Sequence, residues 1–226
     1  MLEELLLQWN PYRGLTSPPS TPIRLWCEGG RGVWIDNVWG PAVPYPPVDH
    51  GDGRQNYGYV RIKDNPGNLR LIPEAADWPE MTAFLVAVNA AGSPIESVGC
   101  EKAFSPAELQ RGPTVKLTSY TDVVFTDAAL NDAPENALLL SSHLLQAVQG
   151  CECWWSEIEI VLERFRGVIG ASAPWGLMLR VTGYGRDEDE ARKWWGESIG
   201  RIAKAVTKLP RDLSWRKPWI WGSRSL

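Results

Sequence analysis

The sequence is poor in the residues from which enzyme and metal sites are most often built. Only two histidines and four cysteines occur among its 226 residues. Cys151 and Cys153 would point the same way on a strand, but two thiols make at most half of a zinc site, and no Cys-x-x-Cys pair completes it. Because no convincing catalytic signature is present, we expect a protein without a cofactor that is not an enzyme.

Long apolar runs and a secretory leader are also missing. No stretch approaches the roughly 20 apolar residues that a membrane-spanning helix needs. Residues 1–9 carry Glu3 and Glu4 and lack the positive region of a signal peptide. Without such a leader, the cysteines are expected to stay reduced inside a cell. These absences predict a soluble, cytoplasmic protein that does not span a membrane.

Charge is distributed very unevenly along the chain. Residues 164–226 hold 13 Lys or Arg and 6 Asp or Glu, a balance of +7. Residues 1–163 hold 10 and 21, a balance of −11, so the net charge of −4 hides a bipolar molecule. Such asymmetry favours a partner of opposite charge or a head-to-tail contact between copies.

Tryptophan is abundant, and three of the 13 tryptophans lie in the short ending 211–226 among four basic residues. Trp and Arg are favoured anchors of protein interfaces. We therefore predict that a protein partner or a neighbouring subunit docks on the C-terminal region. The residues expected to carry this interface are Trp215, Arg216, Lys217, Trp219 and Trp221.

Gly, Pro and Asn divide the first half of the chain into short segments typical of hairpins. After a helix and a proline-rich connector in 1–21, residues 22–110 are predicted to form an antiparallel β-rich domain, a sandwich or a small barrel. The expected strand pairs are Ile23–Glu28 with Gly32–Trp39, Tyr57–Lys63 with Leu69–Ile72, and Thr82–Asn89 with Ile95–Cys100.

Longer alternating and helical patterns fill the predicted second domain, residues 111–226. Strands are expected at 115–126, 153–164 and 176–184, and helices at 132–149 and 187–209. Asp187 is the expected cap of the second helix, with Glu190 three residues later. A last strand at 213–221 would complete a β-α-β-β-α-β ferredoxin-like plait. The predicted fold class is therefore α+β.

The expected plait raises a second hypothesis, the binding of single-stranded nucleic acid. The central strands of such folds present aromatic rings on which bases stack. The residues expected on that face are Lys116, Tyr120, Arg180 and Tyr184. However, the basic-aromatic run of RNA-binding plaits is missing, and the acidity of residues 1–163 disfavours a polyanion. The same face could instead be covered by the β-rich half.

A polar loop supplies a third hypothesis, a metal-dependent hydrolase. Asp49, His50 and Asp52 lie within four residues, and such groups can ligate a divalent ion or carry acid–base chemistry. Asp-Gly is equally typical of turns, and His143 is expected on a helix as a structural residue. We therefore expect a non-catalytic binding or assembly protein, with nucleic-acid binding and metal-dependent hydrolysis as alternatives.

Overall fold

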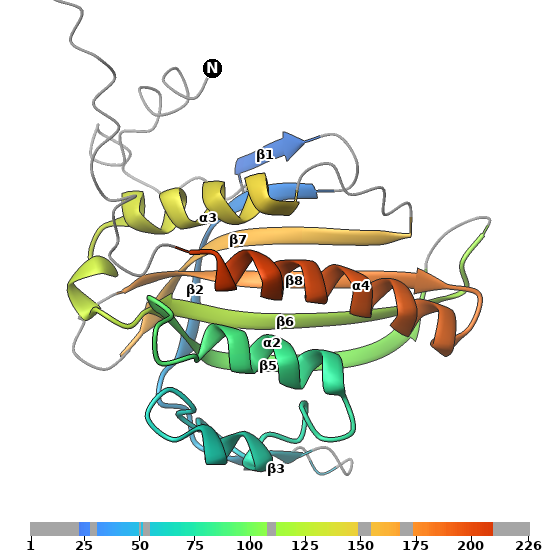
Figure 1. Cartoon of the computed structure of the whole chain (residues 1–226), viewed down its shortest axis with the longest axis horizontal. Coiled ribbons are helices and arrows are strands. Elements are labelled where there is room, and N and C mark those ends of the chain that lie inside the picture. The colour runs from blue at the N-terminus through green and yellow to red at the C-terminus, as the bar shows by residue number, and fades with distance from the viewer. Residues whose placement is uncertain are drawn as a thin grey trace, which may run out of the picture.

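A six-stranded sheet with three helices on one face forms the body of the protein (Figure 1). The computed structural model describes residues 23–27, 31–49, 51, 55–107, 112–148, 155–167 and 174–209. The strands stand in the order β1-β2-β7-β8-β6-β5, and all neighbours are antiparallel except β2 and β7. The predicted α+β class is confirmed.

The elements are defined by the following bounds. The strands of the large sheet are β1 (Ile23–Cys27), β2 (Arg31–Ala42), β5 (Ile95–Pro106), β6 (Val115–Phe125), β7 (Ser156–Arg166) and β8 (Trp175–Gly185). The helices are α2 (Pro79–Val88), α3 (Pro134–Val148) and α4 (Glu188–Thr207). Two short 3₁₀ helices, η1 (Pro66–Leu71) and η2 (Ala128–Leu130), and the pair β3 (Val48–Asp49) and β4 (Gln55–Asn56) complete the described elements.

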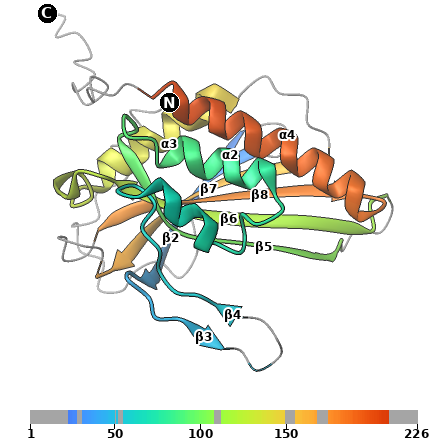
Figure 2. The same cartoon turned by 60° about the horizontal axis from the view of Figure 1, so that its bottom comes forward.

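The main core lies between the helices and one face of the sheet. α4 crosses β8 and β6 and packs between α2 and α3, so the helices form a single layer (Figures 1 and 2). Alternate strand residues point into this layer, among them Leu117, Leu179 and Val181, each at most 2% exposed. Trp195 of α4 is fully buried, and its indole N–H donates to Oγ of Ser119 at 2.8 Å.

The other face of the sheet has no helix among the described elements. A small apolar cluster of Val43, Val98, Val124 and Phe165 covers one end of it. The register places Val124 and Phe165 near the carboxyl ends of β6 and β7. The opposite end of this face is polar, and it is there that the candidate site lies.

The start of α4 follows the sequence prediction. The Asp187 side chain accepts the backbone N–H of Glu190 at 2.8 Å, and the Glu190 carboxylate accepts that of Arg186 at 2.8 Å. Three acidic residues in the first turn, Glu188 to Glu190, complement the positive end of the helix dipole. The local sequence therefore specifies where this helix begins.

The order of β7, β8 and β6 is the one that a ferredoxin-like plait would have, with α3 and α4 as its helices. The place beside β6 that the last plait strand would take is occupied by β5, which pairs antiparallel with β6 from Ile95–Phe125 to Pro106–Val115. The complete plait is therefore not confirmed. The predicted strand at 213–221 lies outside the described residues.

The predicted strand at Thr82–Asn89 is wrong, because this segment lies in α2. Pro79 occupies the first turn of the helix, and Met81, Phe84, Leu85 and Val88 bury one face at helical spacing. A short apolar run suits a buried helix as well as a strand, and here the helix prevails.

The predicted strand pair Tyr57–Lys63 with Leu69–Ile72 is also wrong. Asn65 accepts the N–H of Gly67 with its side chain, and Pro66 then begins the 3₁₀ helix η1. The first predicted pair forms as β1 and β2. Because β1, β2 and β5 all join the large sheet, the separate sandwich or barrel is not confirmed, and strands from both sides of residue 110 share one sheet.

Candidate functional site

The described part of the proline-rich loop has the geometry of a turn. Asp49 is exposed in β3, and its Oδ1 accepts the backbone N–H of Gly51 at 2.9 Å. His50 and Asp52 lie outside the described residues, so the metal-dependent hydrolase stays a prediction. Within the described ranges, no three His, Cys, Asp or Glu residues are grouped so that they could hold a metal ion.

The four residues of the nucleic-acid hypothesis lie together on the face of the sheet opposite the three described helices. Lys116 of β6 pairs with Tyr184 of β8, and Tyr120 of β6 pairs with Arg180 of β8. The interface residues predicted at 215–221 lie outside the described residues.

Carboxylates hold three of these four side chains, those of Tyr120, Arg180 and Tyr184. The Tyr120 hydroxyl donates to Oε2 of Glu101 at 3.2 Å, and the Tyr184 hydroxyl donates to Oε2 of Glu157 at 3.0 Å. Arg180 donates from Nη1 to Oε2 of Glu159 at 3.3 Å. We call the surface formed by these six residues the acidic sheet face: Glu101, Tyr120, Glu157, Glu159, Arg180 and Tyr184.

The acidic sheet face is ordered by strand register. Glu101, Tyr120, Arg180 and Glu159 stand directly opposite one another across β5, β6, β8 and β7. Directly opposite side chains in antiparallel strands interact at close range. The row therefore places an acid, an aromatic residue, a base and a second acid side by side across four paired strands.

The carboxylates also set the protonation state of the two tyrosines. Burial and then the charge of Glu101 raise the pKa of Tyr120, and burial and then Glu157 raise that of Tyr184. Both phenols thus remain neutral hydrogen-bond donors across the physiological range. The three carboxylates outnumber the guanidinium of Arg180 and the ammonium of Lys116, which lies beside Tyr184, so the face keeps a small excess of negative charge.

Trp155 extends the site at the end where Tyr184 lies. Its backbone carbonyl accepts the Tyr184 N–H at 2.8 Å, and its side chain is 43% exposed. A large exposed aromatic residue next to a tyrosine-bearing strand is typical of protein interfaces. The alternation of Glu157 and Glu159 with apolar residues was a signal in the sequence, but nothing in the sequence singled out Trp155 or Glu101.

A buried carboxyl lies further along the same face. Asp122 is 2% exposed, and its Oδ1 has no hydrogen-bond partner. The space it occupies exists because its neighbour on β5 is Gly99, where a Cβ would lie 3.0 Å from Oδ2. Burial and then the charge of Glu163 raise the pKa of Asp122 well above its ordinary value. The protein thus carries an acid that favours its neutral form.

Two described groups that resemble nucleophiles are not activated. Residues 196–200 have the G-x-S-x-G spacing of hydrolase nucleophile turns, but they lie inside α4, where Ser198 is fully buried and bonded to Oγ of Ser156 at 2.8 Å. Burial raises the pKa of the Cys100 thiol, which favours the unreactive form. Both residues serve packing.

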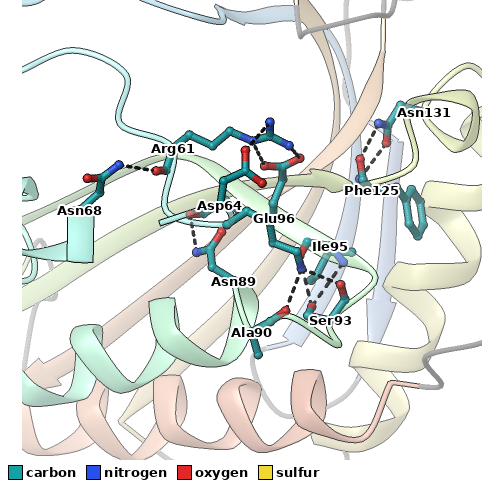
Figure 3. A network of polar contacts seen from close by, with 12 residues as sticks. Arg61, Asp64, Asn68, Asn89, Ala90, Ser93, Ile95, Glu96, Phe125 and Asn131 are labelled. Carbon is teal, nitrogen blue, oxygen red and sulfur yellow. Dashed lines mark hydrogen bonds and ion pairs between the residues drawn. The ribbon is translucent and has the colours of Figure 1, made fainter. Parts of the chain in front are cut away.

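A second polar cluster ties the segment before α2 to the start of β5 (Figure 3). Arg61 donates from Nε and Nη2 to both carboxylate oxygens of Glu96, at 2.9 and 3.1 Å, and its Nη1 lies 2.8 Å from Oδ2 of Asp64. Glu96 is 6% exposed, so this bidentate pairing offsets the cost of burying its charge.

A cavity of about 140 Å³ lies beside this cluster, lined in part by Val43, Tyr59, Arg61, Glu96 and Asn131. Arg61 directs its donors to carboxylates of the protein. The Asn131 amide is bonded to the backbone N–H and C=O of a β6 residue, at 2.8 and 2.9 Å. Because these polar groups are engaged within the protein, the cavity offers little to a polar ligand, and the cluster serves the fold.

Lys63 stabilises the turn between α2 and β5 in this cluster. Its ammonium donates to the backbone carbonyls of Ala90, Ser93 and Ile95, at 2.9, 2.6 and 2.9 Å. We expect Lys63→Met to lower the free energy of unfolding by about 2 kcal/mol, because charge-assisted hydrogen bonds to the turn are lost. Urea unfolding followed by tryptophan fluorescence measures this, and Lys208→Met, at an exposed position, is the control. Equal stability of the two variants would contradict the assignment.

Comparison with known proteins adds no relative, since the chain matches no family model, no curated protein and no solved structure. None of the described helices is long and apolar enough to cross a membrane. The function is therefore inferred from the chemistry of the surfaces described above.

Proposed function

We propose that this protein acts by binding another protein rather than by catalysis, and that the acidic sheet face receives the partner. The observation that carries the proposal is the row Glu101–Tyr120–Arg180–Glu159, which fixes interface-forming side chains on a face of the sheet that none of the described helices covers. Tyrosine and arginine held by neighbouring carboxylates lose little further conformational freedom on binding, which favours affinity.

The charge of the face selects the partner. Three carboxylates against the two cations Arg180 and Lys116 leave the face weakly negative, which favours a basic partner surface over a polyanion within a Debye length of about 10 Å. The arrangement supports a basic protein partner over single-stranded nucleic acid, although the tyrosines and Arg180 occupy the positions that base stacking would need.

The basic, tryptophan-rich ending remains a second proposed docking region. Trp215, Arg216, Lys217, Trp219 and Trp221 have the composition of an interface for an acidic partner or a neighbouring subunit. An assembly protein with one acidic and one basic surface would suit both proposals.

Charge reversal tests the acidic sheet face. Glu157→Lys/Glu159→Lys is expected to abolish salt-sensitive capture of the partner by the tagged full chain, because both changes invert the charge of the face. Capture and its dependence on salt are measured by pull-down and mass spectrometry of the same lysate. The control Glu135→Lys/Asp189→Lys changes the net charge equally at exposed positions on the helices.

Three results would argue against this function. Undiminished capture by Glu157→Lys/Glu159→Lys would show that the acidic sheet face does not bind the partner. Loss of capture in both this variant and the control would show that capture depends only on the net charge of the protein. Salt-sensitive binding of oligouridine that Tyr120→Ala and Tyr184→Ala abolish would support nucleic-acid binding instead.

A further inference from the structure

The outward surface of α4 carries the complement of the acidic sheet face. The exposed residues Lys193, Glu197, Lys204 and Lys208, with the half-buried Arg201 whose Nη1 atom is enclosed, follow one another at spacings of three or four residues, so they form one stripe along the helix. The buried residues of α4, including Trp195, Ile199, Ile202 and Val206, lie on the opposite side of the helix. This basic stripe therefore points away from the sheet.

The basic stripe and the acidic sheet face lie on opposite sides of the two-layer molecule. α4 packs on the covered face of the sheet, between α2 and α3 (Figures 1 and 2), whereas the strand register places the carboxylates on the other face. Each copy of the chain thus presents one basic and one acidic surface in opposite directions.

We propose that the partner of the acidic sheet face is a second copy of this chain, docked through its basic stripe. This inference rests on the proposed function of the face. The contact is heterologous, because the two surfaces differ and lie on opposite sides. Each added copy consequently leaves one free surface of each kind, and the contact propagates from copy to copy.

The two surfaces match in charge and in length. The stripe has four basic residues and one acidic residue. Its span from Lys193 to Lys208 is about 22 Å at the rise of an α-helix. The acidic positions of β7 are Glu157 and Glu159 within the acidic sheet face and Glu163 beyond it, and together they extend over about 20 Å at the rise of a strand. A net charge of −4 does not prevent this contact, because charges beyond about 10 Å are screened at ordinary salt.

Sedimentation velocity of the purified full chain tests the proposal. At about 0.01 M salt the average mass is expected to rise with protein concentration beyond that of a dimer, and at about 1 M salt it is expected to fall toward the monomer. A monomer at every concentration in low salt would overturn the inference.

Charge-swapped variants identify the surfaces. Glu157→Lys/Glu159→Lys and Lys204→Glu/Lys208→Glu are each expected to abolish self-association alone, because each leaves two surfaces of like charge. Mixing the two variants is expected to restore association, since each then supplies the surface that the other lost. The control Asp132→Lys/Glu135→Lys, which changes the net charge equally at exposed positions near the start of α3, should associate like the unaltered chain.

The outcomes separate this inference from the function on which it rests. A monomeric chain whose acidic face still captures a different basic protein refutes the second copy as partner and leaves the proposed function standing. Self-association that the variants do not weaken, or that mixing does not restore, refutes the pairing of these two surfaces. If the unaltered chain captures neither a second copy nor any other protein in a salt-sensitive way, both this inference and the proposed function are refuted.

Discussion

Gly183→Ala is expected to lower the free energy of unfolding by about 3 kcal/mol or more, the largest effect of any change considered. A Cβ at this position of β8 would overlap the backbone carbonyl of Ala191 and the backbone nitrogen of Trp195 in α4. Backbone atoms on both sides leave no flexible side chain to move aside. The helix would have to lift from the sheet and expose Trp195. Chemical unfolding followed by tryptophan fluorescence measures the loss.

Gly200→Ala on the same helix is the matched control. A Cβ at Gly200 meets nothing within 4 Å, so alanine there is expected to stabilise the protein by about 0.5–1 kcal/mol through its better helix propensity. If Gly183→Ala lowers the free energy of unfolding and Gly200→Ala raises it, the close approach of α4 to β8, rather than the loss of a glycine as such, explains the destabilisation. A Gly183→Ala variant as stable as the unaltered chain would show that the backbone of α4 does not approach Gly183 of β8 as closely as described.

Asp122→Asn is expected to change how stability depends on pH. Because burial and Glu163 raise the pKa of Asp122, the folded protein keeps this proton to a higher pH than the unfolded chain does. Stability is therefore greatest below the unfolded pKa, about 3.9, and falls as pH rises toward the folded pKa. The slope for one proton approaches about 1.4 kcal/mol per pH unit. Asparagine, which does not titrate, removes this slope.

Denaturant unfolding of both proteins between about pH 4 and pH 8 measures the effect. The two stability curves should diverge as pH rises, with the asparagine variant gaining relative to the unaltered chain. Groups that share this environment are Tyr45, Cys100 and Tyr120, whose raised pKa values each have Asp122 or burial as a cause. Glu135→Gln, at an exposed position, is the control. Parallel curves for Asp122→Asn and the unaltered chain would show that Asp122 ionises normally in the folded state.

The correct predictions from the sequence rest on interactions between residues that are close in the chain. The cap Asp187, the acidic first turn of α4 and the alternation in β6, β7 and β8 all act between residues close in the chain, so they could be recognised in the sequence. The short apolar segment 82–88 misled because it suits a helix and a strand equally. Its helical state is settled by burial of Phe84 and Leu85 against the sheet and α4.

The candidate site could be predicted only in part. The alternating pattern placed Tyr120, Arg180 and Tyr184 on one face, since strand periodicity is a property of the local sequence. The carboxylates that hold them come from β5 and β7, and the pairing of Glu101 with Tyr120 and of Glu159 with Arg180 depends on register between strands. Register is not encoded by any single segment, so the negative charge of this face was not foreseen.

The sequence by itself determined an α+β protein of bipolar charge with long amphipathic helices and alternating strands, because composition and periodicity depend on each residue and its near neighbours. Only the tertiary structure decided that β5 takes the place beside β6, and that β2 joins the sheet beside β7. These pairings bring together residues far apart in the chain. They turned separate charges into an acidic sheet face on one side and a basic stripe on the other, because strand order and helix packing assign each side chain its direction.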